Sequence, residues 1–312
     1  MKNMPPLPVD LLTRNLQHPG KKVSMVLDTD TYNEIDDQFA LAYALRSPEA
    51  VHIEAIYAAP FHNDRSTGPE NGMELSYNEI LNVLKRMNEP LENHQVFKGS
   101  RSFLQAKDEP VDSPAARDLV ARAMAHSPED PLYVVGIGAI TNVASALLME
   151  PRIRERIVLL WLGGHARIYP SANEFNLKQD VWASQLIFDC GAPLIWFPCL
   201  GMANILSTCL AELEKDLKGH SNIGDYLVEI VKGYHPDHYA WSKVIWDLAP
   251  IAWLVDPNCI QSIIASSPIL NDDMTLSRDD SRHPINETIL IHRNSVFRDV
   301  FRKLKAAPSS PL

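Results

Sequence analysis

The feature that most constrains the fold is a regular alternation of short apolar runs with longer segments whose apolar residues recur at helical spacing. The runs are rich in β-branched and aromatic residues, as strands are. Strands that alternate with helices form right-handed βαβ units, so we predict an α/β fold with a mainly parallel, Rossmann-like central sheet flanked by helices. The predicted strands cover residues 23–27, 52–58, 132–135 and 157–162, and the predicted helices cover 39–45, 73–87, 141–149 and 180–188.

The last third of the chain is expected to be more helical than the rest. Helical spacing predicts helices over 226–232 and 246–254. Residues 288–292 form a late predicted strand before a basic final helix. The polar stretches 62–72 and 271–286 are predicted loops.

The chain is expected to form a single domain, because no internal repeat and no low-complexity linker separates its parts. Residues 1–22 contain Pro5, Pro6 and Pro8 and several charges, without an apolar core followed by a small-residue cleavage site. We therefore predict an untargeted N-terminal arm over 1–22. One α/β domain with a helical C-terminal part is predicted over 23–312.

The overall charge excludes two classes of partner. The 312 residues include 29 Lys and Arg against 39 Asp and Glu, a formal net charge of −10. Binding to nucleic acid or to an anionic membrane depends on clustered Lys and Arg, which this balance does not supply, so neither partner is expected. No apolar run approaches the roughly 20 residues that cross a bilayer. The four cysteines form no Cys-x-x-Cys pair, which favours reduced thiols and a cytoplasmic location.

Five carboxylates crowd the ten residues that follow the first predicted strand: Asp28, Asp30, Glu34, Asp36 and Asp37. Like charges this close resist joint ionisation unless a cation or strong hydrogen bonds neutralise them. Capping of the next helix accounts for one or two of them, but not for the two at the strand end. Parallel sheets bind ligands beyond the carboxyl ends of their strands. The cluster therefore predicts a catalytic or hard-cation site that prefers Ca²⁺ or Mg²⁺.

One interpretation of the cluster is a phosphohydrolase. Residues 28–31 read Asp-Thr-Asp-Thr and resemble the Asp-x-Asp-x-Thr motif of the haloacid dehalogenase type. That resemblance implies a nucleophilic Asp28, an acid/base Asp30 and a second acidic pair just after a later apolar strand. The later acidic pairs, at 272–273 and 279–280, fall in a predicted loop instead. This alternative is therefore the less favoured one.

A second resemblance extends over most of the chain. A strand ends in Asp-x-Asp, a short loop follows, and Asp-Asp opens a helix; the other matching segments follow in order. They are 26–30 with 36–41, Gly136-Ile137-Gly138-Ala139-Ile140-Thr141-Asn142, Leu162-Gly163-Gly164, Glu174-Phe175-Asn176 and Trp246-Asp247. From about residue 22 to about residue 305, the chain resembles the nucleoside hydrolases of the inosine-uridine-preferring family.

This resemblance implies a metal centre. By it, Asp30, Asp37 and Asp247 hold a Ca²⁺ ion together with the backbone carbonyl of Ile137, and water and sugar hydroxyls complete the shell. Ca²⁺ accepts such a large and irregular oxygen shell. The resemblance also implies that Asp30 is the general base that takes a proton from metal-bound water. Asp28 would not bind the ion itself but would help to orient the residues that do.

The same resemblance implies a sugar site. Asp36 would accept hydrogen bonds from ribose hydroxyls, and Glu174 and Asn176 would contact the sugar near the oxocarbenium-like transition state. Asn63 follows the second predicted strand, where the family carries a sugar-binding Asn. His238 lies in a segment that we interpret as a mobile flap over the substrate.

Two departures from the family pattern affect the substrate. Trp246 stands where members that hydrolyse both purine and pyrimidine nucleosides often carry His. It resembles the purine-preferring branch, in which aromatic stacking favours protonation of the departing purine, so we group Trp246 with Asp30 as catalytic. The loop from Thr31 to Ile35 has five residues in place of the family's three, with Asn33 and Glu34 added. The sugar pocket is expected to differ accordingly.

Together these features predict Ca²⁺-dependent hydrolysis of the N-glycosidic bond of a ribonucleoside, with a purine-type base favoured. Metal-bound water would attack, and free base and ribose would be released. Two further alternatives remain open, namely hydrolysis of another glycoside on the same scaffold and non-catalytic binding of metal and ribose. The expected partner is a small nucleoside or related glycoside, and the expected assembly is a homo-oligomer, either a dimer or a tetramer.

Overall fold

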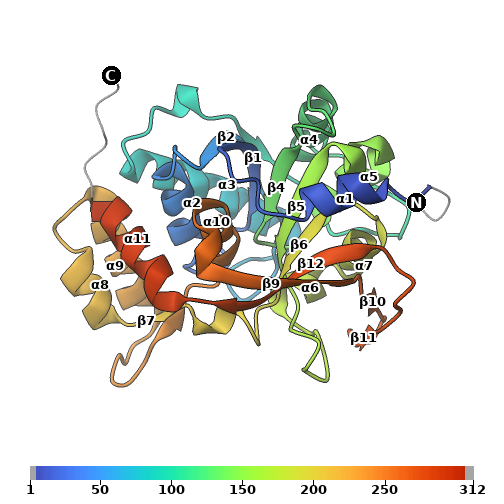
Figure 1. Cartoon of the computed structure of the whole chain (residues 1–312). Helices are drawn as coiled ribbons and strands as arrows, with labels where there is room; N and C mark the ends of the chain where they lie inside the picture. Colours follow the sequence, from blue (N-terminus) through green and yellow to red (C-terminus); the bar gives the residue numbers. More distant parts are fainter. Residues whose placement is uncertain (1–4, 306–312) are drawn as a thin grey trace.

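A central sheet of eight strands organises the chain (Figure 1). The computed structural model describes residues 5–305, so the ends of the expected arm and domain, at 1–4 and 306–312, lie outside the described residues. The strands of the sheet are β1 (Val23–Thr29), β2 (Val51–Ala58), β3 (Val96–Lys98), β4 (Leu132–Gly136), β5 (Ile157–Leu162), β6 (Leu194–Phe197), β9 (Ile260–Ser266) and β12 (Pro284–Ile291). Two small sheets pair β7 (Ser207–Thr208) with β8 (Lys243–Val244), and β10 (Ile269–Leu270) with β11 (Leu276–Ser277).

The strand order is β3-β2-β1-β4-β5-β6-β12-β9, and every neighbouring pair is parallel except β12 with the edge strand β9. Parallel sheets are covered on both faces, and their strands are correspondingly apolar. β4, β5 and β6 are buried along their whole length. The predicted mainly parallel sheet in a single α/β domain is confirmed.

Helices cover both faces of this sheet (Figure 1). They are α1 (Val9–Asn15), α2 (Asp37–Leu45), α3 (Pro69–Arg86), α4 (Pro114–Ala125), α5 (Thr141–Met149), α6 (Phe175–Gln179), α7 (Val181–Asp189), α8 (Leu210–Asp216), α9 (Asn222–Tyr234), α10 (Leu248–Val255) and α11 (Arg293–Lys305). Short 3₁₀ helices cover η1 (Leu91–Asn93), η2 (Pro151–Glu155), η3 (Ala203–Ile205) and η4 (Pro257–Cys259). Within residues 5–305, none of the helices combines the length and the apolar character needed to cross a membrane.

The two faces of the sheet contribute to two apolar cores. Successive residues of a strand point to opposite faces, so Met25 and Leu27 of β1 belong to one core and Val26 belongs to the other. The first core includes residues of α2, α3, α9, α10 and α11, and the second includes residues of α4, α5 and α7. The two layers of helices fix the sheet between them and leave its carboxyl edge free to carry polar side chains.

Several elements escape the sequence pattern for physical reasons. β3 and β6 have three and four residues, too few to show a period of two. β9 leaves four residues exposed, so it lacks the apolar run of a buried strand. α4 is not predicted either, although Ser113 caps it by accepting a hydrogen bond from the Ala116 N–H at 3.1 Å, and Pro114 begins it.

Three predicted boundaries are wrong. α3 begins at Pro69, inside the predicted loop 62–72, since proline suits a first helical position. β11 and the first residues of β12 lie inside the predicted loop 271–286. The helix predicted over 246–254 begins at Leu248, with the preceding Asp as its N-cap. Trp246, which precedes this N-cap, therefore lies outside the helix.

The segment predicted as an N-terminal arm contains regular structure in its described part. α1 buries Leu11 and Leu12, which form a small apolar cluster with Leu7. Farther along, the ring of His18 packs edge-on against Trp253 of α10, with ring centroids 5.0 Å apart. These contacts dock the segment onto the domain.

The buried strand β6 provides a test of the fold. Ile195 is fully buried at its centre, and we expect Ile195→Ala to lower the free energy of unfolding by about 2–5 kcal/mol, because the cavity cannot collapse fully. The matched control is Ile168→Ala, at a side chain that is 85% exposed, with an expected change within about 0.5 kcal/mol. Urea denaturation measures both. Equal losses in the two variants would contradict this placement of β6.

Candidate active site

A cavity of about 320 Å³ opens at the carboxyl edge of the sheet. The strand order reverses direction around β1 and β4, which are neighbours although β2 and β3 intervene in the chain. Such a switch point leaves a crevice between the loops that follow the two strands, and ligands bind there. The lining residues are Asp30, Asn33, Glu34, Asp36, Asp37, Ile137, Leu162, His165, Glu174, Phe175, Asn176, Cys199, Leu200, Trp246 and Asp247.

The loops after β1 and β4 approach each other closely. The Ile137 N–H donates to the carbonyl of Asp28 at 2.9 Å and extends the pairing of the two strands. Gly138 follows, and a Cβ atom at this position would lie 2.9 Å from Cγ of Asp30. A residue without a side chain is therefore needed for the β4 loop to pass beside Asp30. This explains the glycine-rich character of the segment.

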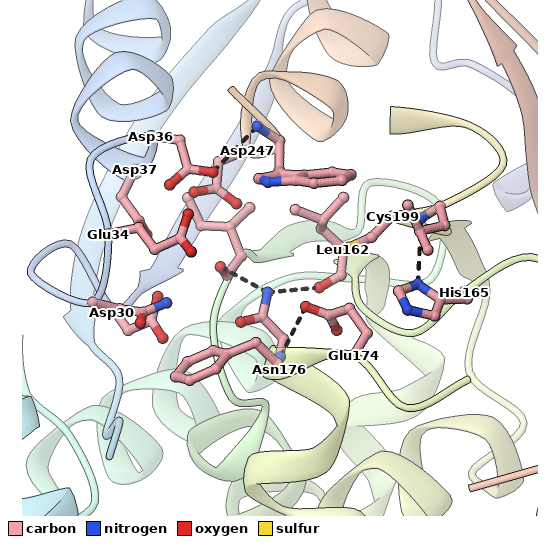
Figure 2. Close-up of a pocket in the computed structure, with 15 residues that line it drawn as sticks. Asp30, Glu34, Asp36, Asp37, Leu162, His165, Glu174, Asn176, Cys199 and Asp247 are labelled. Atoms are coloured by element: carbon pink, nitrogen blue, oxygen red, sulfur yellow. Dashed lines mark hydrogen bonds between the residues drawn. The ribbon is translucent and has the colours of Figure 1, made fainter. Parts of the chain in front are cut away.

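Three carboxylates converge on one side of the cavity (Figure 2). Asp36, Asp37 and Asp247 are buried, and each has an oxygen within 4.8 Å of the others. The Thr29 hydroxyl donates to Asp37 Oδ1, and the Trp246 N–H donates to Asp36 Oδ2 at 3.2 Å. Asp36 and Asp247 stand at the N-cap positions of α2 and α10 without a side-chain capping hydrogen bond, so their carboxylates stay directed to the cavity. This is an arrangement of oxygen donors that can hold a metal ion.

Asp30 lies beside this group, and its carboxylate differs from the others in its lack of partners. Both of its carboxylate oxygens are buried, and neither has a hydrogen-bond partner among residues 5–305. Its neighbour Asp28 is also buried, but Oδ1 accepts a hydrogen bond from Asn142 Nδ2 at 2.7 Å. A buried carboxylate without partners is expensive unless a cation or water meets it. Asp30 therefore indicates where such a partner belongs.

Burial dominates the electrostatics of these acids. It raises the pKa of Asp28 and of Asp37 to about 7, and that of Asp36 to about 6. Burial and the neighbouring carboxylates also raise the pKa of Asp30 and Asp247 well above the usual range. A divalent cation would offset this repulsion, and a set of buried carboxylate oxygens suits a hard cation. The residues present thus fit a metal centre.

Glu174 and Asn176 face the carboxylates from the opposite side of the cavity (Figure 2). Glu174 caps the short helix α6 and accepts hydrogen bonds from the N–H groups of Asn176 at 3.0 Å and Gly164 at 2.8 Å. The side-chain amide of Asn176 donates to the carbonyls of Ile137 and Leu162, both at 3.1 Å. A carbonyl oxygen has two lone pairs, so this contact leaves Ile137 able to accept a second partner.

The other predicted site residues divide between the cavity and its surroundings. Trp246 lines the cavity, whereas Trp253 lies in the apolar core. Asn63 does not line it, and instead donates through Nδ2 to Oδ1 of Asn33 at 2.7 Å. His238 also lies outside the cavity lining, with Nε2 3.1 Å from the carbonyl of Lys232 and its ring against Trp241. Substrate contact by Asn63 and by His238 stays a prediction.

Some lining residues are missing from the sequence prediction. His165 lies three residues after the end of β5, and its Nδ1 accepts a hydrogen bond from the Leu200 N–H at 3.3 Å. Burial lowers the pKa of this imidazole, which keeps it neutral. Cys199 follows β6, and burial raises the pKa of its thiol. The rule that ligands gather after strands already applies to His165, since β5 was predicted, and would have found Cys199 had β6 been identified.

Comparisons with known sequences identify the family of this chain. The family model described as "Inosine-uridine preferring nucleoside hydrolase" matches residues 25–294. The pyrimidine-specific ribonucleoside hydrolase RihA of Salmonella typhimurium is 26% identical over 269 residues, which cover 77% of this chain and 81% of that protein. The chain therefore belongs to the inosine-uridine preferring nucleoside hydrolase family, whose members are N-glycosyl hydrolases.

Solved structures show the same fold. A plant nucleoside hydrolase, PpNRh1, superposes with a TM-score of 0.72 at 21% identity, over 92% of this chain and all of that one. A purine-preferring ribonucleoside hydrolase from Gardnerella vaginalis also gives a TM-score of 0.72, at 18% identity, over 90% of this chain and 98% of the other. The phosphohydrolase alternative is rejected, because the family model is that of nucleoside hydrolases and the acidic pairs at 272–273 and 279–280 lie outside the cavity.

The raised carboxyl pKa values predict an unusual pH dependence of stability in the metal-free protein. The folded chain keeps protons on Asp28, Asp36 and Asp37 that the unfolded chain loses above pH 3.8, so stability falls as pH rises from about 4 to about 7. We expect a loss of at least about 2 kcal/mol, since one pKa unit is worth about 1.4 kcal/mol per group. Urea denaturation at pH 5 and pH 7.5 in chelator measures it.

The control for this experiment is the same pair of measurements in excess Ca²⁺. An ion bound to the carboxylates favours their ionised form, so we expect the pH dependence to flatten and stability at pH 7.5 to rise. Equal stability at the two pH values in chelator would contradict the proposed burial of unpaired carboxylates.

Proposed function

We propose that the protein hydrolyses the N-glycosidic bond of a ribonucleoside in the presence of Ca²⁺, and releases free base and ribose. The observation that carries the proposal is the carboxylate of Asp30. It lines the cavity beside Asp36, Asp37 and Asp247, and both of its oxygens are buried without a partner among the described residues. A carboxylate in this position can accept a proton from a water molecule in the cavity.

Ca²⁺ suits the donors present. The converging group contains carboxylates alone, without His or Cys, and Ca²⁺ prefers oxygen ligands in an irregular shell. By the family resemblance, the residues that would hold it are Asp30, Asp37 and Asp247, with the backbone carbonyl of Ile137. Asp36, whose oxygen also converges with those of Asp37 and Asp247, would be left to the sugar. When bound, such an ion lowers the pKa of water and orients it toward an electrophilic carbon.

The protein's own residues would then perform the remaining steps. Asp30 would remove a proton from the attacking water as its oxygen bonds to C1′ and the C1′–N bond breaks, and the departing base takes up a proton to become the free base. Attack from one face inverts the anomeric carbon. Asp36 accepts hydrogen bonds from ribose hydroxyls and fixes the ring above the water. Glu174 and Asn176 contact the sugar from the far side, where a carboxylate stabilises the positive charge that develops on the ring.

Trp246 would act on the leaving group. Its side chain lines the cavity, and an aromatic face attracts a cationic ring, so it favours a protonated purine. The named relatives carry both preferences: RihA is described as pyrimidine-specific and the Gardnerella vaginalis enzyme as purine-preferring. We propose a purine-type base because Trp246 lines the cavity.

A second candidate is hydrolysis of another glycoside on the same scaffold. It is favoured by Asn33 and Glu34, because both belong to the lengthened loop and both line the cavity. We further propose a homo-oligomer in the cytoplasm. The four cysteines are free thiols, as a reducing compartment maintains them.

The proposal is tested with a substrate panel. The Ca²⁺-loaded protein is incubated with inosine, adenosine, guanosine, uridine and cytidine, and reducing sugar is assayed. Sugar release from at least one purine nucleoside is expected. Release only from non-nucleoside glycosides would favour the second candidate. Tight nucleoside binding in calorimetry, with the ligand intact after long incubation, would instead identify a binding protein without catalysis.

We predict that Asp30→Asn lowers kcat by at least about a hundredfold, because the amide cannot accept the proton of the attacking water. The fold should remain, since the substitution removes a buried charge. Steady-state kinetics and circular dichroism measure the two effects. Asp272→Asn, at an exposed carboxylate outside the cavity, is the matched control and should leave kcat unchanged. A near-normal rate in Asp30→Asn would exclude Asp30 as the base.

We predict that Trp246→Leu lowers kcat/KM for purine nucleosides about 3- to 30-fold more than for pyrimidine nucleosides, the range expected for loss of a cation–π contact. Competition between inosine and uridine measures the ratio directly. Trp182→Leu, at a Trp on the surface of α7 that is 37% exposed, is the control. An unchanged purine-to-pyrimidine ratio in Trp246→Leu would remove this residue from leaving-group activation.

A further inference from the structure

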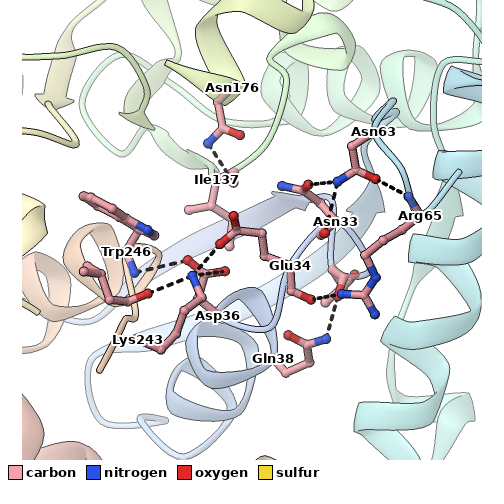
Figure 3. A network of polar contacts seen from close by, with 12 residues as sticks. Asn33, Glu34, Asp36, Gln38, Asn63, Arg65, Ile137, Asn176, Lys243 and Trp246 are labelled. Carbon is pink, nitrogen blue, oxygen red and sulfur yellow. Dashed lines mark hydrogen bonds and ion pairs between the residues drawn. The ribbon is translucent and has the colours of Figure 1, made fainter. Parts of the chain in front are cut away.

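A buried ammonium group lies behind the active-site cavity (Figure 3). The Lys243 side chain is 8% exposed, forms an ion pair with Glu34, and lies 4.0 Å from Asp36 Oδ1. Its Nζ also donates to the carbonyl of Val244 at 3.0 Å and lies 5.5 Å from the ring centroid of Tyr234. The closeness of two carboxylates keeps this buried lysine charged.

Glu34 separates this ammonium group from the cavity. Its side chain is 36% exposed and lines the cavity, whereas Lys243 does not. The ion pair occupies Oε2 of Glu34, and no hydrogen bond within residues 5–305 involves Oε1. The second oxygen is therefore an acceptor that a ligand in the cavity can use.

The backbone around Glu34 is held in place (Figure 3). Arg65 Nη1 donates to the Glu34 carbonyl at 3.0 Å, and Asn63 Nδ2 donates to both the carbonyl and the side chain of Asn33. Asn33 and Glu34 are the residues by which the loop exceeds the family's usual length. The additional residues thus form an anchored part of the cavity wall.

The charges around the cavity decide what it can admit. The lining carboxylates belong to Asp30, Glu34, Asp36, Asp37, Glu174 and Asp247, and no Lys or Arg is among the lining residues. A cation bound to the aspartates leaves Glu34 outside the neutralised group. A phosphorylated ligand would meet this carboxylate, which is paired with Lys243 and 36% exposed, before it could reach the ammonium group, and like charges repel.

We propose that Glu34 is a specificity-determining residue that shields Lys243 and thereby makes the cavity select uncharged glycosides, whose hydroxyl groups donate to Oε1, over phosphorylated ones. This inference rests on the proposed function, because it takes a glycoside as the ligand. It gives the lengthened loop a role in substrate selection, which is separate from the binding of a metal ion by the aspartates.

The test compares the binding of ribose and ribose 5-phosphate to the Ca²⁺-loaded protein by isothermal titration calorimetry. In Glu34→Gln the amide keeps the shape but leaves Lys243 with Asp36 as its one remaining carboxylate neighbour of the two, so we expect the affinity for ribose 5-phosphate to rise about tenfold relative to that for ribose. The double variant Glu34→Gln with Lys243→Met should lose this gain. Glu212→Gln, at a carboxylate paired with Arg293 away from the cavity, is the matched control and should leave the ratio unchanged.

The outcomes separate this inference from the proposed function. Measurable binding of both sugars with the same affinity ratio in the wild-type protein and in Glu34→Gln would overturn the role of Glu34 alone. A gain that persists in the double variant would overturn the shielding of Lys243. Binding of neither sugar to any variant would contradict the proposed sugar site itself, and this inference with it.

Discussion

The burial of negative charge at the carboxyl edge of β1 and β4 is the constraint on which the rest of the site depends. Asp28, Asp30, Asp36, Asp37 and Asp247 all lie at or near zero exposure, where ionised carboxylates are costly. The sheet brings them together because its order reverses at these two strands, and the glycine-rich β4 loop passes close beside them. The proposed metal site, the proposed base and the predicted pH dependence of stability all follow from this concentration of carboxylates.

The chain neutralises part of that charge by itself. The side-chain amide of Asn142 donates a hydrogen bond to Asp28, and the hydroxyl of Thr29 donates one to Asp37. Asp36 accepts a hydrogen bond from a backbone N–H and lies near the ammonium group of Lys243. Among residues 5–305, the carboxylate of Asp30 is left without such a partner. The arrangement therefore separates carboxylates that the protein holds in place from one that remains available to accept a proton, which is the distinction that a hydrolytic site requires.

Local sequence patterns made much of the fold and of the candidate site predictable. The strand–helix alternation predicted the parallel sheet, and the cluster after the first strand predicted Asp30, Asp36 and Asp37 as cavity residues. Residues that reach the site from distant segments were harder to predict. Lys243 belongs to a two-residue strand with no periodicity, and its partnership with Glu34 depends on tertiary packing. Asn63 lies outside the cavity lining because the lengthened loop places Asn33 between it and the cavity.

The central claim is that the buried carboxylates hold a divalent cation over which the glycoside binds. The most direct test is a crystal structure of the protein grown with Ca²⁺. The account predicts an ion with about 2.3–2.6 Å bonds to oxygens of Asp30, Asp37 and Asp247 and to the carbonyl of Ile137. A structure in which Ca²⁺ binds elsewhere, or in which these carboxylates stay close together without an ion at saturating Ca²⁺, would contradict it.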